Sequence, residues 1–274
     1  MKLSVIIPTC NRNDLLAKCL ELLSPKNQTI KELYEVIVTD DSKDNISKAL
    51  IEENYSWAKW VEGSKRGPAA NRNNGAKSAS GEWLIFIDDD CLPDKTLVET
   101  YSSAIKKDNG SLAFEGSIIP DNWYLMRKEM AECPINTDGN CFWSANICIN
   151  SKLFCSIGGF DERFLIAAQE DQDIFLRLKN YTNIRFLKNC IVVHPVRYGS
   201  VIKKLDGIKI QFENWIYYTQ KHSDKSIKSH LLLSVFDYIK IAVKNIIRFR
   251  FRYFFISIVK SGYSLYLFTT YKTK

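Results

Sequence analysis

Three consecutive aspartates, Asp88, Asp89 and Asp90, follow a short apolar run at residues 83–87. A run of aromatic and β-branched residues predicts a buried strand, and open α/β sheets bind ligands beyond the carboxyl ends of their strands. Neighbouring carboxylates repel one another unless a cation or a set of hydrogen bonds compensates. Their oxygens suit Mg²⁺ or Mn²⁺, ions that commonly hold substrate phosphates as well. The alternative is a solvated acidic turn before a helix at residues 96–107.

A second acidic pair, Asp40 and Asp41, ends the apolar run at residues 35–39. Because parallel strands bring their carboxyl ends to one edge of a sheet, we expect both acidic groups to line one crevice. The segment between them carries Arg66 and Arg72 and begins a helix, where backbone N–H groups and guanidinium groups favour a phosphate. For both arginines the alternative is an ordinary surface ion pair.

The elements that must position these groups alternate along the first 110 residues. Strands are expected at residues 3–7, 35–39, 59–62 and 83–87, and helices at residues 14–23, 46–53, 67–79 and 96–107. This alternation predicts an α/β fold in which helices cover a parallel sheet. Further strands are expected at residues 112–119, 145–149, 184–187 and 191–194, further helices at 123–133, 152–157 and 171–179, and mainly helix after residue 206.

The overall composition is that of an ordinary globular protein. The chain has 274 residues, 46% hydrophobic and 25% charged, enough for one large domain or two coupled subdomains. The apolar run before Pro8 is too short for a signal peptide. Eight cysteines without a Cys-x-x-Cys pair predict reduced thiols in a cytoplasmic protein rather than a disulfide framework.

Positive charge is concentrated near the C-terminus. Residues 221–274 contain 11 Lys or Arg and 2 Asp or Glu, whereas the chain as a whole has a net charge of +7. Lys240, Lys244, Arg248 and Arg252 are spaced four apart and form a stripe beside apolar positions. This pattern predicts an interfacial helix on an anionic membrane surface, over residues 231–274. The alternative is a helix that packs on the rest of the protein with a solvated basic face.

Two other roles for this basic region, a membrane-spanning helix and a nucleic-acid-binding surface, are less well supported. Lys260 interrupts the apolar stretch that follows Arg252, so the sequence offers no clean run of about 20 apolar residues for a spanning helix. No nucleic-acid motif accompanies the charge, and we expect no nucleic-acid partner.

The ordered set of motifs resembles glycosyltransferase family 2. The set consists of SVIIPTCNR at residues 4–12, VIVTDDS at 36–42, NRNNGA at 71–76, GEWLIFIDDD at 81–90, GGFDERF at 158–164 and EDQDIFLRL at 170–178. The resemblance covers roughly residues 1–195. It implies the GT-A fold, a Rossmann-like mixed, mostly parallel sheet flanked by helices. It also implies inverting transfer from a nucleotide-diphosphate sugar, with a UDP-sugar favoured.

The resemblance assigns roles on the donor side. Pro8 and Asp41 match positions that contact the nucleotide, and Asp88 and Asp90 match the ends of the Asp-x-Asp motif. Asp90 matches the direct ligand of Mn²⁺ or Mg²⁺, with Asp88 as a second candidate ligand. Donor contacts are further expected from Asp89, Arg66 and Arg72, although neither arginine aligns firmly. His194, after an apolar strand, is a further candidate metal ligand or a structural histidine.

The resemblance also assigns an acceptor side. Asp171 matches the catalytic base, while Glu170, a candidate acceptor contact, and Asp173 are competing carboxylates. Trp143 and Asn146 lie where the family has an acceptor-side segment. Ser144 replaces the usual glycine there, and Trp143 is equally compatible with core packing. The loop at residues 164–169 is expected to border the active site.

We therefore expect a metal-dependent enzyme that builds a cell-surface glycan on a glycan or lipid-linked acceptor at the cytoplasmic face of a membrane. Residues 1–110 would bind the nucleotide-sugar, residues 111–205 the acceptor, and residues 206–274 would form a helical extension. One alternative is a non-catalytic GT-A scaffold or partner subunit. Another is a nucleotidyltransferase, for which the glycine-rich phosphate loop after the first strand is lacking.

Overall fold

The computed structural model describes residues 2–271, and within them the chain forms two compact units. The first unit runs up to Asp121 and resumes over Cys133–Pro195. The second consists of Asn122–Glu132 and the chain from Val196 onward. All the candidate donor, metal and acceptor residues belong to the first unit, and the basic helical region belongs to the second.

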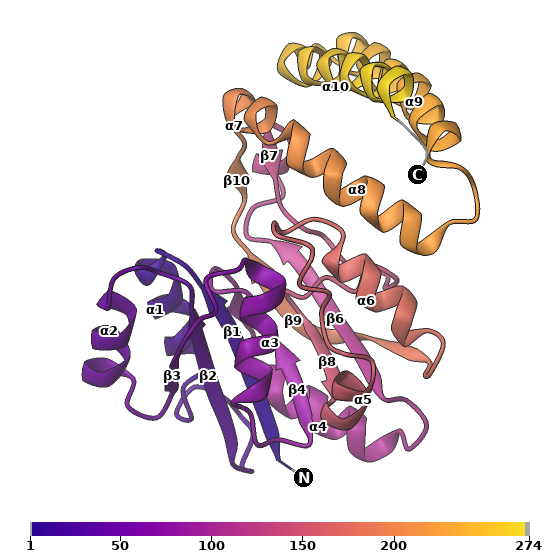
Figure 1. Ribbon diagram of the computed structural model, residues 1–274. Helices are drawn as coiled ribbons and strands as arrows, with labels where there is room; N and C mark the ends of the chain where they lie inside the picture. The colour runs from indigo at the N-terminus through magenta and orange to yellow at the C-terminus, as the bar shows by residue number, and fades with distance from the viewer. Residues whose placement is uncertain (1, 272–274) are drawn as a thin grey trace. The chain divides into compact units, whose positions relative to one another are not determined.

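The described part of the first unit is built around an eight-stranded mixed sheet (Figure 1). The strand order is β3-β2-β1-β4-β8-β6-β9-β5, and β1 pairs in parallel with both β2 and β4. The strands are β1 (Leu3–Thr9), β2 (Tyr34–Asp40), β3 (Lys59–Glu62), β4 (Trp83–Phe86), β5 (Leu92–Pro93), β6 (Ala113–Pro120), β8 (Ile147–Asn150) and β9 (Ile184–His194). This arrangement confirms the α/β class with a mostly parallel sheet.

Helices cover both faces of this sheet because its strands are apolar on both sides. Along β1, Val5 and Ile7 belong to one buried cluster, whereas Ile6 between them belongs to the other. The first cluster includes residues of α1 (Asn13–Leu22), α2 (Ile46–Asn54) and α4 (Leu97–Lys107). The second includes residues of α3 (Pro68–Lys77), α5 (Ser151–Ser156) and α6 (Glu170–Leu178).

Two expectations about local structure require correction. The strands expected at residues 184–187 and 191–194 are one continuous strand, β9, whose pairing with β6 shifts register between Gly116 and Ser117. The helix expected at residues 123–133 does not form. The segment contains a 3₁₀ turn, η1 (Leu125–Arg127), and a short strand, β7 (Ala131–Glu132), separated by Met130 with a left-handed φ of 66°. Such a backbone conformation ends a right-handed helix.

The second unit is mainly helical, as expected. Strand β7 pairs with β10 (Arg197–Tyr198), and the helices are α7 (Val201–Asp206), α8 (Ile208–His222), α9 (Ile227–Ile247) and α10 (Phe251–Thr270). Helices α9 and α10 form an antiparallel hairpin in which hydroxyl groups on α10 donate to backbone carbonyls of α9. The Ser261 hydroxyl donates to the Val235 carbonyl at 3.1 Å and the Ser264 hydroxyl to the Leu231 carbonyl at 3.2 Å. None of the helices described combines the length and hydrophobicity needed to cross a membrane.

Candidate active site

The topology brings four strand ends to one edge of the sheet. Strands β1, β2 and β4 are parallel neighbours, so the acidic groups after β2 and β4 share this edge, as the sequence predicted. Strand β8 is antiparallel to both β4 and β6, and β6 is parallel to β9. Strand β9 therefore points the same way as β4, and His194 at its end reaches the same edge as Asp90.

The three consecutive aspartates have different nearest neighbours. Asp88 accepts a hydrogen bond at 2.8 Å from the guanidinium of Arg72 on α3. Asp89 accepts one at 2.8 Å from the hydroxyl of Thr9, and Asp90 lies 3.4 Å from the imidazole Nε2 of His194. Asp89 and Asp90 are only 3% and 2% exposed, so they do not form a solvated acidic turn. The Arg72 cation beside Asp88 and the Arg12 cation, 3.1 Å from Asp89 and 3.8 Å from Asp90, reduce the repulsion that three adjacent carboxylates would otherwise suffer.

Asp89 also pairs with Arg12, whose guanidinium lies 3.1 Å from one of its oxygens. Burial raises the pKa of Asp89, and the Arg12 cation and the Thr9 hydroxyl oppose that rise. Neither Arg12 nor Thr9 was predicted as a site residue, although both lie in the motif at residues 4–12, Thr9 at the end of β1 and Arg12 just before α1. Both oxygens of Asp89 are thus engaged within the protein, and its expected contact with the donor remains a prediction.

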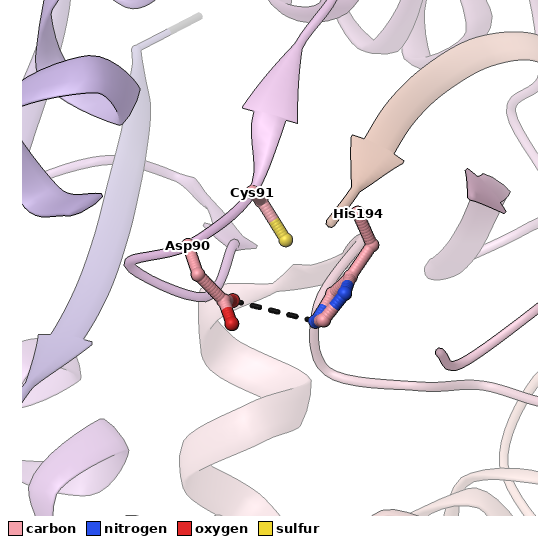
Figure 2. A group of neighbouring side chains, drawn as sticks. All are labelled: Asp90, Cys91 and His194. Carbon is pink, nitrogen blue, oxygen red and sulfur yellow. Dashed lines mark ion pairs between the residues drawn. The ribbon is translucent and has the colours of Figure 1, made fainter. Parts of the chain in front are cut away.

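Asp90, Cys91 and His194 point toward one another (Figure 2), with one ligand atom from each residue within 4.8 Å of the others. The Nδ1 atom of His194 lies 3.0 Å from the carbonyl oxygen of Pro195. A hydrogen bond there places the proton of a neutral imidazole on Nδ1 and leaves the lone pair of Nε2 facing the Asp90 carboxylate. Two electron-rich atoms in such a position favour a cation between them, and histidines that bind metals commonly donate their other N–H group to a carbonyl.

This donor set fits a divalent cation. A carboxylate oxygen suits Mg²⁺ or Mn²⁺, and an imidazole nitrogen favours Mn²⁺ over Mg²⁺. The thiol of Cys91, which sequence analysis missed, is fully buried and lies 3.8 Å from the carbonyl oxygen of Ala145. The only sequence signal for Cys91 was its place directly after the acidic triplet.

Arg72 links the acidic triplet to the start of α6. Its guanidinium lies 2.8 Å from Asp88 and 3.3 Å from Glu170, and its side chain is only 5% exposed. Burial alone would lower the pKa of Arg72, but the negative charges of Asp88, Asp171 and Glu170 outweigh it and the pKa is raised. Arg72 is therefore a buried cation held by several carboxylates rather than a surface ion pair.

The carboxylates at the start of α6 occupy different environments. Asp173 is fully buried and pairs with Arg177 one turn later on the same helix, at 2.8 Å. Asp171 accepts a hydrogen bond at 3.1 Å from the backbone N–H of Ser144 through its Oδ2 atom. Its Oδ1 atom is buried and has no hydrogen-bond partner within residues 2–271. Asp171 thus has one oriented oxygen and one oxygen available to a proton donor.

Glu170 and Asp171 are adjacent acidic residues whose pKa values are both shifted. Burial raises the pKa of both carboxyl groups, and the Arg72 cation opposes the rise in each case. The charge of Asp171 further raises the pKa of Glu170. Perturbed carboxyl groups of this kind are typical of active sites, because a raised pKa makes a carboxylate a stronger base.

The neighbourhood of Asp41 forms a second part of the site. Its Oδ1 atom accepts a hydrogen bond at 2.7 Å from the backbone N–H of Lys65. Burial raises the pKa of Asp41, and the N–H groups of Lys65 and Gly67 oppose that rise. Asn71 on α3 ties this region together, because its amide donates at 2.9 Å to the Thr39 carbonyl.

Arg66 and Gly67 border the loop at residues 164–169. Arg66 is 59% exposed and pairs with Glu162 at 2.7 Å, which is the surface ion pair that the sequence left open. Gly67 has a φ of 94°, and a Cβ atom there would lie 2.4 Å from the carbonyl oxygen of Leu165. Only glycine therefore allows the start of α3 to approach this loop so closely.

Two of the three candidate acceptor residues, Trp143 and Asn146, are tied to the core. Asn146 is fully buried; its amide donates at 2.9 Å to the carbonyls of Ser117 and Cys190 and accepts from the Tyr101 hydroxyl at 2.8 Å. Trp143 is partly buried and packs against the larger hydrophobic cluster. Asn146 clearly fixes the segment that carries Ser144. Contact of either residue with an acceptor remains a prediction.

Comparison with known proteins agrees with this geometry. A family model described as "Glycosyl transferase family 2" matches residues 4–153, and one described as "Glycosyltransferase like family 2" matches residues 124–192. The chain belongs to glycosyl transferase family 2. It is 38% identical over 117 residues to a GalNAc(5)-diNAcBac-PP-undecaprenol beta-1,3-glucosyltransferase of Campylobacter jejuni. That alignment covers 41% of this chain and 36% of the relative, so the chain spans about a third of the relative's length.

Solved structures of other proteins share the fold. TarS of S. aureus (residues 1–349), in complex with UDP-GlcNAc, superimposes with a TM-score of 0.59 at 22% identity, over 82% of this chain and 68% of TarS. The mannosyltransferase PcManGT of Pyrobaculum calidifontis, in complex with GDP-Man and Mn²⁺, gives a TM-score of 0.58 at 16% identity, over 99% of this chain and 76% of that protein. At these identities the likeness establishes the GT-A fold.

Proposed function

We propose that this protein is an inverting, metal-dependent glycosyltransferase. It would move a sugar from a nucleotide-diphosphate sugar to a hydroxyl group of a glycan or lipid-linked acceptor in cell-surface polysaccharide synthesis. The observation that carries this proposal is Arg72, which joins Asp88 to Glu170 and so places Asp171 beside the acidic edge of the sheet. A buried cation at that position is suited to both phosphate and carboxylate groups.

On the donor side, we assign Pro8 and Asp41 to the nucleotide and Arg72 to the diphosphate. The Asp41 carboxylate can accept a hydrogen bond from the imide N–H of uracil. A UDP-sugar is our first choice, supported by the UDP-GlcNAc complex of TarS, which has the same fold. The GDP-Man complex of PcManGT makes guanosine donors the main competitor. Arg66 and Asp89 would contribute at the edge of the donor site.

We assign the metal to Asp90 and His194, with Asp88 as a second candidate carboxylate ligand. Mn²⁺ is favoured over Mg²⁺ because one of the ligands is an imidazole. When bound, the cation would neutralise the negative charge that develops on the leaving diphosphate. The contact of His194 Nδ1 with the Pro195 carbonyl, at 3.0 Å, would hold the imidazole ring in its ligand orientation.

The chemical step is assigned to Asp171. Its Oδ2 atom is held by the N–H of Ser144, while its Oδ1 atom would take the proton of the acceptor hydroxyl as that oxygen attacks the anomeric carbon. A single displacement of this kind inverts the anomeric configuration. Glu170 would act mainly by holding Arg72, and Asp173 is committed to Arg177.

The name of the Campylobacter jejuni relative supports our choice of acceptor class. The Campylobacter jejuni enzyme is named for an undecaprenol diphosphate-linked acceptor, so we propose a lipid-linked or glycan acceptor here. Trp143 and Asn146 would lie on the acceptor side, with the Trp143 ring as a stacking surface for a sugar. The reaction would then take place at the cytoplasmic face of a membrane.

The proposal is tested by donor binding and donor hydrolysis with UDP-, GDP- and dTDP-sugars, in Mn²⁺, in Mg²⁺ and in EDTA. We expect one nucleotide to be selected in the presence of metal. Asp90→Ala should remove the metal dependence, whereas Asp224→Ala, a change at an exposed carboxylate of the second unit, should not.

Two results would contradict the proposal. Failure of the folded wild-type protein to bind any of these donors would favour a non-catalytic scaffold. Release of pyrophosphate from a nucleoside triphosphate, with no use of nucleotide-sugars, would favour a nucleotidyltransferase.

A further inference from the structure

One side of α9 carries an exposed apolar stripe. At about 100° per residue, side chains spaced three and four apart share one face of a helix. Leu232, Phe236, Ile239, Val243 and Ile246 follow this spacing, and each is at least 39% exposed. The residues that α9 buries, among them Leu231, Val235 and Ala242, lie on a different side of the helix. The stripe is therefore additional to the apolar surface that folds this unit.

Helix α10 carries a matching stripe. Phe251, Phe255, Ile258 and Leu265 have the same spacing, and each is at least 45% exposed. On each helix, the stripe lies roughly a third of a turn around the helix axis from the residues that contact the other helix. The direction of this rotation is the same for both helices when each is viewed along its own axis from the N-terminus. In an antiparallel pair this places the two stripes on one side of the hairpin.

Helix α8 occupies the opposite side. Its Ile208 and Phe212 pack in a cluster with Leu231 of α9 and with Val259, Tyr263 and other residues of α10. The Phe212 ring lies 5.2 Å from the ring of Tyr263, centroid to centroid. The second unit thus has a filled apolar core under the hairpin and a second apolar layer, which we call the outer face, on the hairpin's other side.

Cationic side chains border the outer face. Lys240, Lys244 and Arg248 line an open groove on α9 together with Ile239, Val243 and Ile247, with a volume of about 370 Å³. Arg250 and Arg252 lie in and next to the turn between the helices, where the Phe249 side chain is 79% exposed. Residues 227–271 contain seven Lys or Arg and one acidic residue, Asp237. Long basic side chains beside apolar ones suit a surface where lipid headgroups meet acyl chains.

We propose that the outer face of the α9–α10 hairpin binds an anionic lipid bilayer, with both helices lying in the plane of its surface. A water-facing role would not explain nine or more large exposed apolar side chains on one side. A protein partner would have to be acidic as well as apolar, whereas an anionic bilayer supplies both properties over the whole length of the hairpin. This inference does not depend on the sugar-transfer reaction, and it can fail or succeed independently.

The first experiment uses the wild-type chain and co-sedimentation with vesicles. Vesicles of phosphatidylcholine alone are compared with vesicles that contain about 30% phosphatidylglycerol, at about 0.1 M and about 0.5 M salt. We expect binding to the anionic vesicles that weakens at high salt but does not vanish, since the apolar contacts persist. Equal binding to both vesicle types, or binding to neither, would overturn the proposal.

Variants then test the two components of the face. Lys240→Gln, Lys244→Gln and Arg248→Gln together should weaken partition by on the order of 100-fold, because each basic group near an anionic surface contributes about 1 kcal/mol. The matched control removes three lysines elsewhere in the same unit, with Lys209→Gln, Lys221→Gln and Lys225→Gln. A pure net-charge effect would weaken binding equally in both variants and would contradict the assignment to this face.

Ile239→Ser with Val243→Ser should weaken partition at least about 10-fold by removing apolar contact with acyl chains. The control, Leu33→Ser with Ile46→Ser, removes exposed apolar side chains of the first unit and should leave binding unchanged. Light scattering on the same proteins tests whether the partner is a second copy of this chain instead of a membrane. A lipid-free dimer that dissociates in the Ile239→Ser, Val243→Ser variant, without vesicle binding by the wild type, would show that a second copy covers the outer face instead.

Discussion

The two units of this protein distribute charge and apolar surface in opposite ways. In the first unit, charged groups such as Arg72, Asp89 and Glu170 are buried and paired. In the second unit, large apolar side chains such as Phe236 and Phe255 are exposed, and the charged groups beside them are solvated. Buried charges are costly unless they are held in fixed geometry, and exposed apolar surface is costly unless something covers it. Buried charges in fixed geometry are typical of a catalytic centre. Exposed apolar surface is typical of a site that binds a membrane or another molecule.

The largest effect is expected from Asp171→Asn, which tests the buried charged groups of the first unit. The amide keeps the size of the side chain but cannot take a proton, so we expect kcat to fall on the order of 10³-fold with donor binding retained. Steady-state transfer assays and donor titration measure the two quantities separately. Asp224→Asn provides the exposed control. A variant with near wild-type kcat would remove Asp171 from the reaction.

The second test compares two arginines close together in sequence. Arg72→Gln leaves Asp88 and Glu170 without their shared cation, and we expect the free energy of unfolding to fall by about 3–5 kcal/mol. Arg66→Gln removes an exposed ion pair with Glu162 and should cost no more than about 1 kcal/mol. Urea denaturation followed by circular dichroism measures both. Equal losses would mean that Arg72 is not the buried link described above.

The third test compares two isoleucines on α10. Ile256 is 4% exposed and Ile258 is 45% exposed. Ile256→Ala should lower the free energy of unfolding by about 2–5 kcal/mol through lost burial and a cavity. Ile258→Ala should change it by no more than about 0.5 kcal/mol, because the side chain already faces outward. A large loss from Ile258→Ala in lipid-free protein would show that the outer face is covered within the folded chain.

The smallest effect concerns pH. Burial raises the pKa of Asp171 above its ordinary value, so kcat/KM should be lost as the pH falls through this raised pKa, at a higher pH than for an ordinary aspartate. Arg72 lowers that pKa, so Arg72→Gln should move the acid limb of the profile upward by about 1–3 pH units. Arg72→Lys, which keeps the positive charge, should largely restore its position. If the acid limb of the kcat/KM profile did not move in Arg72→Gln, Arg72 would not influence the pKa of the catalytic base.

Local patterns in the sequence were sufficient to predict most of the first unit's sheet. Strands such as β1 and β4 are short apolar runs, and the helix at α3 begins with Pro68 after Gly67. The two-residue strands β5, β7 and β10 carry no such periodicity, because they depend on pairing with distant partners. Nothing in the local sequence predicts the left-handed backbone conformation of Met130, which is why a helix was expected at residues 123–133.

The candidate site was only partly predictable for the same reason. The acidic clusters at the ends of β2 and β4 follow from strand direction, and so does their common edge. Which partner each aspartate finds depends on contacts between distant segments, such as Arg72 with Glu170 and Asp90 with His194. No spacing in the sequence indicates that the Asn146 side chain makes hydrogen bonds to three buried groups or that Asp90 and Cys91 lie beside His194.

The seam between α9 and α10 is lined by small hydroxyl residues, with Ser261 and Ser264 bonded to backbone carbonyls of the facing helix. Most helix pairs in water close because apolar side chains between them avoid solvent, and detergent weakens such closure. Hydroxyl-to-carbonyl bonds between closely packed backbones become stronger as the surroundings become less polar. We therefore expect the α9–α10 hairpin to keep its shape in mild detergent.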